Sequence, residues 1–274
     1  MGLRSRRRKG LMMATMPQAK ETVQSEALYA KVALRYDTVF ERAILAEGRL
    51  TEVVQENMSG RGVLDLACGN GRWLDRFRPA SYVGLDLNLA MLHEARRRYP
   101  DACFVQGDMT RLPFSDSSFE GVISMFGAMG HLSPARQETM IREVWRVLKP
   151  GGLAVLTNGN MWSPFNLPTT LTGGRVRIEG VRVHVHSTTP RRMARLLAGF
   201  RLLRLESYDY SYLPILPLKF AASLVGCDHQ SIYVHWMHLF DHCRYIPTMR
   251  WFGKQLLVVC EKAHGASRLE ARGD

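Results

Sequence analysis

The chain has 274 residues and a mass of 31.1 kDa, with 46% hydrophobic and 23% charged residues. These values lie near the averages of folded, water-soluble proteins, so they exclude a collagen-like, coiled-coil or wholly disordered chain. The 5 cysteines are an odd number and include no C-x-x-C pair, which argues against a disulfide framework and a zinc ribbon. We therefore expect a folded cytoplasmic protein with reduced thiols.

The formal net charge of +12 raises the question of a nucleic-acid or anionic-membrane partner. Much of this excess lies between Arg4 and Lys9, and we interpret residues 1–20 as a disordered basic tail. The apolar stretch that follows is too short for the export region of a twin-arginine signal. Met12, Met13 and Met16 favour an over-extended start site over a nucleic-acid arm. Prolines and a lysine break the most apolar later stretch, 211–227, so the sequence predicts no membrane anchor.

Apolar residues recur at helical spacing across residues 27–54, which predicts N-terminal helices in two pieces. Strand and helix patterns then alternate. The predicted strands are residues 63–66, 82–86, 102–105, 119–125 and 153–157. The predicted helices between them are residues 72–77, 88–99 and 134–148. The later chain predicts a hairpin at 175–186, a helix at 190–199, and strands at 202–210 and 255–261.

This alternation predicts βαβ units, a parallel sheet covered on both faces, and a ligand beyond the carboxyl ends of the strands. We expect N-terminal helices over residues 21–60 and a core over residues 61–263. Long connections at about 160–187 and 211–251 interrupt this core, and residues 264–274 form a C-terminal tail.

A glycine turn follows the first predicted strand, in the pattern Asp65-x-Ala67-x-Gly69-x-Gly71. Such a turn lets the backbone approach a ligand closely, although turns of this kind are also common structural devices. Asp86 ends the second strand, where a carboxylate can accept hydrogen bonds from the hydroxyls of a ribose. After the third strand, Asp108 can accept from an adenine amino group while Met109 covers the ring.

The sequence resembles the class I S-adenosylmethionine-dependent methyltransferases. The similarity rests on VLDLACGNG (63–71), GLD (84–86), GDMTRLPF (107–114), FEGVI (119–123) and VLKPGG (147–152), and Ala67 stands where members of the family often have glycine. The resemblance implies a seven-stranded Rossmann-like sheet, mostly parallel with its last strand antiparallel, helices on both faces, and S-adenosylmethionine as cofactor. It implies these cofactor-binding residues: Tyr36, Asp65, Ala67, Gly69, Gly71, Asp86, Leu87, Asp108 and Met109. A dinucleotide oxidoreductase fits less well, because Leu74 occupies the place of the third glycine in G-x-G-x-x-G.

The segment 124–131 reads SMFGAMGH and lacks the Asn- or Asp-Pro-Pro-aromatic motif of base methyltransferases that resemble this family. We therefore expect methylation of a small metabolite, with oxygen favoured over nitrogen as the acceptor atom, rather than of nucleic acid. Two alternatives stay open: an RNA-binding or RNA-methylating protein, and a regulator that binds the cofactor without catalysis. The acceptor and the oligomeric state, including a homodimer, are left open by the sequence.

His131 is the candidate general base, because imidazole titrates near neutral pH and the family places this loop near the cofactor's methyl end. A histidine that only packs or caps the loop is the equal alternative. The helical spacing of His235, His238 and His242 could suggest a metal site, but no acidic cluster accompanies them, so no metal is expected. We expect acceptor choice to reside mainly in the aromatic-rich residues 211–251, with 160–187 as a second wall, although these aromatics could equally pack a lid or a dimer.

Overall fold

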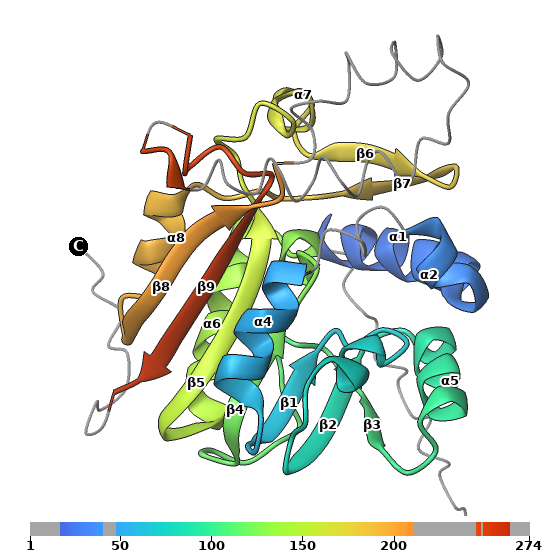
Figure 1. The fold of residues 1–274 in the computed structure, drawn as a ribbon. Helices are drawn as coiled ribbons and strands as arrows, with labels where there is room; N and C mark the ends of the chain where they lie inside the picture. Colours follow the sequence, from blue (N-terminus) through green and yellow to red (C-terminus); the bar gives the residue numbers. More distant parts are fainter. Residues whose placement is uncertain (1–16, 41–47, 211–244, 248, 264–274) are drawn as a thin grey trace, which may run out of the picture.

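The structure is a computed structural model that describes residues 17–40, 48–210, 245–247 and 249–263. Its centre is a seven-stranded sheet of order β3-β2-β1-β4-β5-β9-β8 (Figure 1). The strands are β1 (Gly62–Leu66), β2 (Ser81–Asp86), β3 (Cys103–Gln106), β4 (Phe119–Ser124), β5 (Leu148–Gly159), β8 (Phe200–Tyr208) and β9 (Gln255–Lys262). The predicted Rossmann-like architecture is confirmed.

The strands from β1 to β5 pair in parallel, whereas β9 is antiparallel to both β5 and β8. The last strand therefore enters between two earlier strands, and its residues 256–260 are all buried. Strands that are covered on both faces carry near-continuous apolar runs, and β9 has such a run in LLVVC. The prediction of a final antiparallel strand is confirmed.

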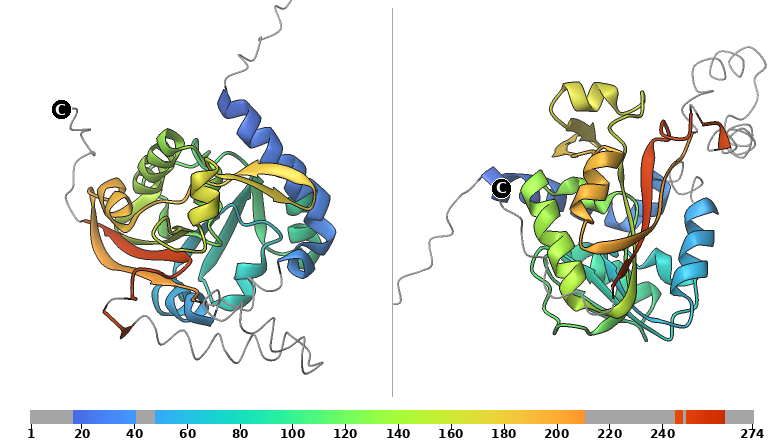
Figure 2. Two further views of the ribbon diagram at one scale, coloured as in Figure 1. Left: turned by 90° about the horizontal axis from the view of Figure 1, so that it is seen from above. Right: turned by 90° about the vertical axis from the view of Figure 1, so that its left-hand side faces the viewer.

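Helices cover both faces of the sheet (Figure 2). On one face, α6 (Pro134–Val147) and α8 (Pro190–Leu196) contribute Met140, Val144 and Met193 to one apolar cluster. On the other face, α4 (Gly48–Met58) and α5 (Leu89–Arg98) contribute Val54 and Leu92 to a second cluster. Since apolar burial is the main driving force of folding, these two layers fix the sheet between them.

The N-terminal helices lie across the end of the sheet toward which the parallel strands point (Figure 1). They are α1 (Pro17–Val32), the short helix η1 (Ala33–Arg35) and α2 (Tyr36–Val39). Above α1 lies a two-stranded hairpin of β6 (Arg175–Ile178) and β7 (Val181–His184), within the predicted hairpin 175–186, which turns at Glu179 and Gly180. Leu28 and Val32 of α1 pack against the apolar side of this hairpin.

Two local predictions differ in detail from the structure. The helix expected at 72–77 is a short 3-10 helix, η2 (Arg72–Arg76), which follows Gly71 in a left-handed conformation. The KPGG part of the VLKPGG motif, residues 149–152, lies inside β5, with Gly151 at a φ of 75°. The disordered tail predicted over residues 1–20 is wrong at its end, because α1 begins at Pro17. Residues 1–16 of that tail, the predicted tail 264–274 and part of the second insertion, 211–244, lie outside the described residues. Within the described part of the chain, none of the helices has the length and apolar character needed to span a bilayer.

Gly84 in the middle of β2 offers a test of how tightly this edge of the sheet is packed. A Cβ at this position would lie 2.7 Å from Phe104 Cδ1 and 2.8 Å from Cys68 Sγ, two side chains buried in the second cluster. We expect Gly84→Ala to lower the free energy of unfolding by about 1–3 kcal/mol, as overpacking does in other cores. Denaturant unfolding followed by circular dichroism measures this value.

The matched control is Gly48→Ala at the start of α4, where a Cβ would meet no atom within 4 Å. This control should leave stability unchanged or raise it slightly, because alanine restricts the unfolded chain. Equal stability of the Gly84 variant and the wild type would contradict the packing described for β2.

Candidate active site

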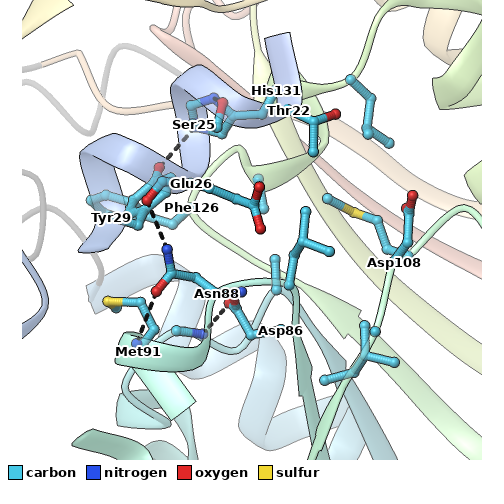
Figure 3. A pocket seen from close by; sticks show the side chains of 18 of the residues that line it. Thr22, Ser25, Glu26, Tyr29, Asp86, Asn88, Met91, Asp108, Phe126 and His131 are labelled. Atoms are coloured by element: carbon cyan, nitrogen blue, oxygen red, sulfur yellow. Dashed lines mark hydrogen bonds between the residues drawn. The ribbon is translucent and has the colours of Figure 1, made fainter. Parts of the chain in front are cut away.

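A pocket lies at the carboxyl ends of β1, β2 and β3, beneath α1 (Figure 3). Segments far apart in the sequence line it. They come from α1, the ends of the three strands, η3 (Ala128–His131) and α6. The lining residues are Thr22, Ser25, Glu26, Tyr29, Tyr36, Ala67, Gly69, Leu85, Asp86, Leu87, Asn88, Met91, Gly107, Asp108, Met109, Met125, Phe126, Ala128, His131, Leu132 and Arg136. This is the edge at which open parallel sheets bind ligands.

Asp86 is held in place by backbone amides. Its Oδ2 accepts a hydrogen bond from Gly69 N at 2.8 Å, and its Oδ1 accepts one from Asn88 N at 2.8 Å. Burial raises the pKa of Asp86, while these amide hydrogen bonds act in the opposite direction. Each carboxylate oxygen accepts more than one hydrogen bond, so Asp86 keeps acceptor capacity on the pocket side.

The turn after β1 exposes its backbone to the pocket. Ala67 and Gly69 have φ angles of 56° and 57°, in the left-handed region that glycine tolerates best. A Cβ on Gly69 would come within 3.1 Å of Met91 Cε, which lines the same pocket. The small residues of this turn therefore keep space beside the backbone for a ligand.

Asp108 joins a polar network that connects β3, α6 and α1. Its Oδ1 accepts from the backbone and hydroxyl of Thr110, both at 2.8 Å, and its Oδ2 accepts from Arg136 Nη2 at 2.5 Å. Arg136 also donates to Thr22 Oγ1 at 2.8 Å, which ties α1 to α6. The structure places Asp108 in the predicted pocket, and it adds an arginine that the sequence reasoning missed.

His131 meets α1 through both of its ring nitrogens (Figure 3). Its Nε2 lies 2.8 Å from the Tyr29 hydroxyl, and its Nδ1 lies 3.3 Å from Ser25 Oγ. Burial lowers the pKa of His131 to about 4, against an opposing effect from the backbone of His184. The imidazole is therefore neutral at pH 7 and is held by groups of the protein itself.

Two predicted cofactor residues do not line the pocket. Asp65 of β1 is buried, and its Oδ2 accepts a hydrogen bond from the hydroxyl of Tyr82 on β2 at 2.8 Å. Burial raises its pKa to about 7. Gly71 has a φ of 74°, and its Cα faces the rings of Tyr99 and Phe104. Neither residue is among those that line the pocket, so their contact with the ligand stays a prediction.

The predicted acceptor walls are only partly described. None of the residues of the 160–187 connection lines the pocket, since the hairpin lies on the outer side of α1. Tyr210, expected in the aromatic surface, is buried and hydrogen-bonds to Ser207 and to the carbonyl of Arg250. The remaining aromatics of 211–244, and His235, His238 and His242, lie outside the described residues. In the described part of the chain, no group of three or more His, Cys, Asp or Glu side chains is placed to hold a metal ion.

The sequence reasoning found Tyr36, Ala67, Gly69, Asp86, Leu87, Asp108, Met109 and His131, all of which line the pocket. It missed the polar side of α1, namely Thr22, Ser25 and Glu26, and it missed Phe126 and Arg136. The apolar spacing of residues 27–54 indicated only which face of the helices is buried. Ser25 and Glu26, four and three positions before Tyr29, lie on the same side of the helix as Tyr29. This spacing could have indicated a polar side of α1, but its role becomes clear only once His131 of η3 is known to face it.

Comparison with known proteins agrees with this geometry. The sequence model of the methyltransferase domain family matches residues 63–152. A fatty-acid O-methyltransferase of Mycolicibacterium smegmatis is 43% identical over 110 residues, covering 38% of this chain and 39% of that protein. A demethylmenaquinone methyltransferase of Beutenbergia cavernae is 35% identical over 161 residues, covering 55% of this chain and 66% of that protein. The chain thus matches between about two fifths and two thirds of the length of these curated relatives.

A methyltransferase solved with the Haloferax volcanii Trm112 methyltransferase activator has the same fold, with a TM-score of 0.61 and 22% identity over 86% of this chain and 98% of that one. The chain is thus similar to class I S-adenosylmethionine-dependent methyltransferases, in sequence over residues 63–152 and in the topology of its sheet. The family match begins at β1 and ends within β5, so it contains the strand ends that form the floor of the pocket. The N-terminal helices and the hairpin lie outside the matched segment.

The low pKa of His131 leads to a prediction for the stability of this protein. Between pH 6.5 and about 4, the unfolded chain takes up a proton at His131 that the folded chain does not, so stability contributed here is complete above pH 6.5 and falls as the pH drops. Replacing His131 with Gln removes this contribution and keeps a polar group near Tyr29. The free energy of unfolding of the wild type minus that of H131Q should therefore decrease from pH 6.5 to 4.

The subtraction is needed because Asp65 acts in the opposite direction. Its carboxyl, with a pKa of about 7, keeps a proton that the unfolded chain loses, so it destabilises the fold as the pH rises toward 7. This effect is present in both proteins and cancels. His93 lies on the exposed side of α5. The free energy of unfolding of the wild type minus that of His93→Gln, measured over the same pH range, gives the background dependence on pH. A difference for H131Q no steeper than this background would contradict the burial of a neutral His131.

Proposed function

We propose that this chain binds S-adenosylmethionine in the pocket beneath α1 and transfers its methyl group to an oxygen or nitrogen of a small, mostly apolar metabolite. The observation that carries the proposal is the arrangement at the end of β2. There, an amide-anchored Asp86 carboxylate lies beside the open backbone of Ala67 and Gly69. This arrangement combines a carboxylate that can accept hydrogen bonds from hydroxyl groups with space for a ligand to lie against the backbone.

The residues present fit the cofactor. Asp86 would accept the ribose hydroxyls, and Met109 would cover the adenine while Asp108 faces its amino group. Asp108 already accepts from Arg136 and Thr110, so Arg136 fixes the direction of its free lone pairs. Tyr36 and Phe126 would close the pocket on the other side, with ring centroids 6.5 Å apart. When bound, the cofactor supplies a methyl group activated by its positive sulfur.

The rest of the lining supports an apolar acceptor. Met125, Phe126, Leu132 and Tyr29 lie between η3 and α1, next to the cofactor residues. Small-molecule sites of this kind bind by apolar contact and use a few polar groups to fix orientation. The names of the relatives agree, since one acts on fatty acids and another on demethylmenaquinone. We infer an acceptor of comparable apolar character.

The geometry of His131 favours acceptors that do not need a strong base. A neutral imidazole with a pKa of about 4, engaged by Ser25 and Tyr29, is a poor acceptor for the proton of an alcohol. A carboxylate arrives without its proton, and an amine can lose one after the transfer. We therefore propose that His131 positions α1 over the pocket, in place of the general-base role expected from the sequence.

Asp86→Ala tests the cofactor site. The variant loses a charge-assisted hydrogen bond to the ribose, so we expect affinity for S-adenosylmethionine to fall by about 2 kcal/mol, or roughly 30-fold. Titration calorimetry measures the affinity. Because Asp86 also accepts from two backbone amides, Asp86→Asn, which keeps one acceptor oxygen, is measured beside it together with the melting temperature of each protein.

The matched control is Asp101→Ala, an exposed carboxylate in the turn before β3. It should bind the cofactor as the wild type does. Unchanged affinity in both Asp86 variants, with melting temperatures near that of the wild type, would contradict the assignment of this pocket to the cofactor.

The activity itself is tested with cofactor labelled in its methyl group. The purified chain is incubated with fatty acids, hydroquinones, amines and total RNA, and the label in each class is counted. Label in an apolar small molecule would support the proposal, whereas label in RNA would support the alternative of an RNA-methylating protein. Tight cofactor binding with no labelled product from a broad metabolite extract would instead indicate a regulator without catalysis.

A further inference from the structure

Apolar side chains are exposed together on the connection between β5 and β6. Met161, Trp162, Phe165, Leu167 and Leu171 are exposed by between 38% and 77%, and they lie within eleven residues of chain. Leu167 and Leu171 begin and end the short helix α7 (Leu167–Leu171). Monomeric proteins rarely leave a large contiguous apolar patch in water, so a group of this kind indicates an interaction surface.

The neighbouring hairpin is amphipathic. Val176, Ile178, Val181 and Val183 alternate along its strands and pack on α1. The opposite side carries Arg175, Arg177 and Arg182, which are all exposed. Because Arg177 pairs directly with Arg182 across the two strands, two like charges lie side by side. Such a pair is destabilising unless an anionic partner compensates it.

The basic character extends through this part of the chain. Residues 160–196 contain six arginines and no lysine, and their single acidic residue is Glu179. Glu179 is already paired with Arg35 of η1 at 2.6 Å. Within the described part of the chain, no ion pair involves Arg175, Arg177 or Arg182. Arg191 of α8 lies 6.0 Å from the ring of Trp162, so basic and apolar groups meet.

Figure 1 shows α7 and the hairpin together at the end of the molecule that carries the pocket. In the view from above they cross the same face (Figure 2). We propose that this face, defined by Met161, Trp162, Phe165, Leu167, Leu171, Arg175, Arg177 and Arg182 and called here the docking face, binds the surface of an anionic lipid bilayer.

The chemistry of the docking face fits such a surface in two ways. Tryptophan, phenylalanine and leucine side chains enter the boundary between headgroups and acyl chains, while arginines bind the anionic headgroups. RNA would satisfy the arginines but leave Leu167 and Leu171 exposed to water, and a second copy of this chain would bring the same arginines together. An anionic bilayer satisfies both groups at once. It would also bring the pocket close to acceptors dissolved in the membrane.

The experiment is sedimentation of the full chain with vesicles of phosphatidylcholine and phosphatidylglycerol in equal parts, and with vesicles of phosphatidylcholine alone, at 0.1 M salt. We expect binding to the anionic vesicles and little to the neutral ones. Replacing Arg177 and Arg182 with Glu should lower the partition coefficient about tenfold or more, and Leu171→Asp should lower it about fivefold. All samples keep residues 1–16, so any contribution from their arginines is common to all of them.

Matched controls change exposed residues elsewhere on the molecule. Arg78→Glu with Arg97→Glu alters the charge by the same amount in the loop before β2 and on α5, and Leu203→Asp replaces an exposed leucine on β8. Both should bind vesicles as the wild type does, and every variant should keep its melting temperature and its affinity for S-adenosylmethionine. Vesicle binding needs neither cofactor nor turnover, so its outcome is independent of the proposed methyl transfer.

Three results would overturn the proposal. The first is that the wild type binds neutral and anionic vesicles equally, or that the docking-face variants bind anionic vesicles as well as the control variants do. The second is dissociation of an oligomer by Leu171→Asp in analytical ultracentrifugation with vesicle binding intact, which would assign the face to a second copy of the chain. The third is loss of RNA binding in the arginine variant, measured by fluorescence anisotropy, while vesicle binding stays unchanged.

Discussion

The site depends on one carboxylate held by two backbone amides. Asp86 accepts from Gly69 N in the turn after β1 and from Asn88 N at the start of α5. Asn88 in turn caps α5 by accepting from Ala90 N and Met91 N, and its amide nitrogen donates to the carbonyl of Glu26 on α1. A short chain of hydrogen bonds therefore fixes the glycine turn, the acid, the helix and the covering segment relative to one another. Because these hydrogen bonds lie within the protein, the geometry is set before any ligand arrives, and Asp86 still has lone pairs for one.

The N-terminal helix contacts the core through polar side chains and also through apolar packing on Met91 of α5. Thr22 bonds to Arg136, while Ser25 and Tyr29 meet His131, so the side of α1 that faces the pocket is hydrophilic. Its apolar side packs outward on the valine-rich hairpin. One helix thus connects two surfaces: the pocket below it and the arginine-bearing hairpin above it. This arrangement links the proposed cofactor site physically to the proposed lipid-docking face.

The sheet and the glycine turn could be predicted from the sequence because their signals are local. Apolar runs such as VLDL and LLVVC mark buried strands, and the spacing of Ala67, Gly69 and Asp86 follows from the strand ends that carry them. The direction of the Asp65 side chain could not be predicted in this way. Both faces of β1 are buried, so only the packing of β2 shows that this carboxyl meets Tyr82.

The position of α1 over the pocket could not be predicted from the sequence either, because its contacts are with residues distant in the chain. Ser25 and Tyr29 meet a histidine more than a hundred positions away, and Thr22 meets an arginine at a similar separation. The alternating pattern of residues 175–184 predicted a hairpin correctly. It could not show that the valines pack on α1 and leave the arginines exposed, because that depends on where α1 lies. Long-range pairing of this kind is set by tertiary structure.

The central claim is that S-adenosylmethionine binds between the strand ends and α1. Amide hydrogen exchange, followed by mass spectrometry with and without saturating cofactor, tests it most directly. If the claim holds, exchange will slow together in the turn containing Gly69, at Asn88, in residues 22–32 of α1 and in η3, because a ligand between them stabilises all four. Exchange in α8 and β8 should change much less. Cofactor binding that leaves α1 and the Gly69 turn unprotected, or that protects a different part of the chain, would contradict it.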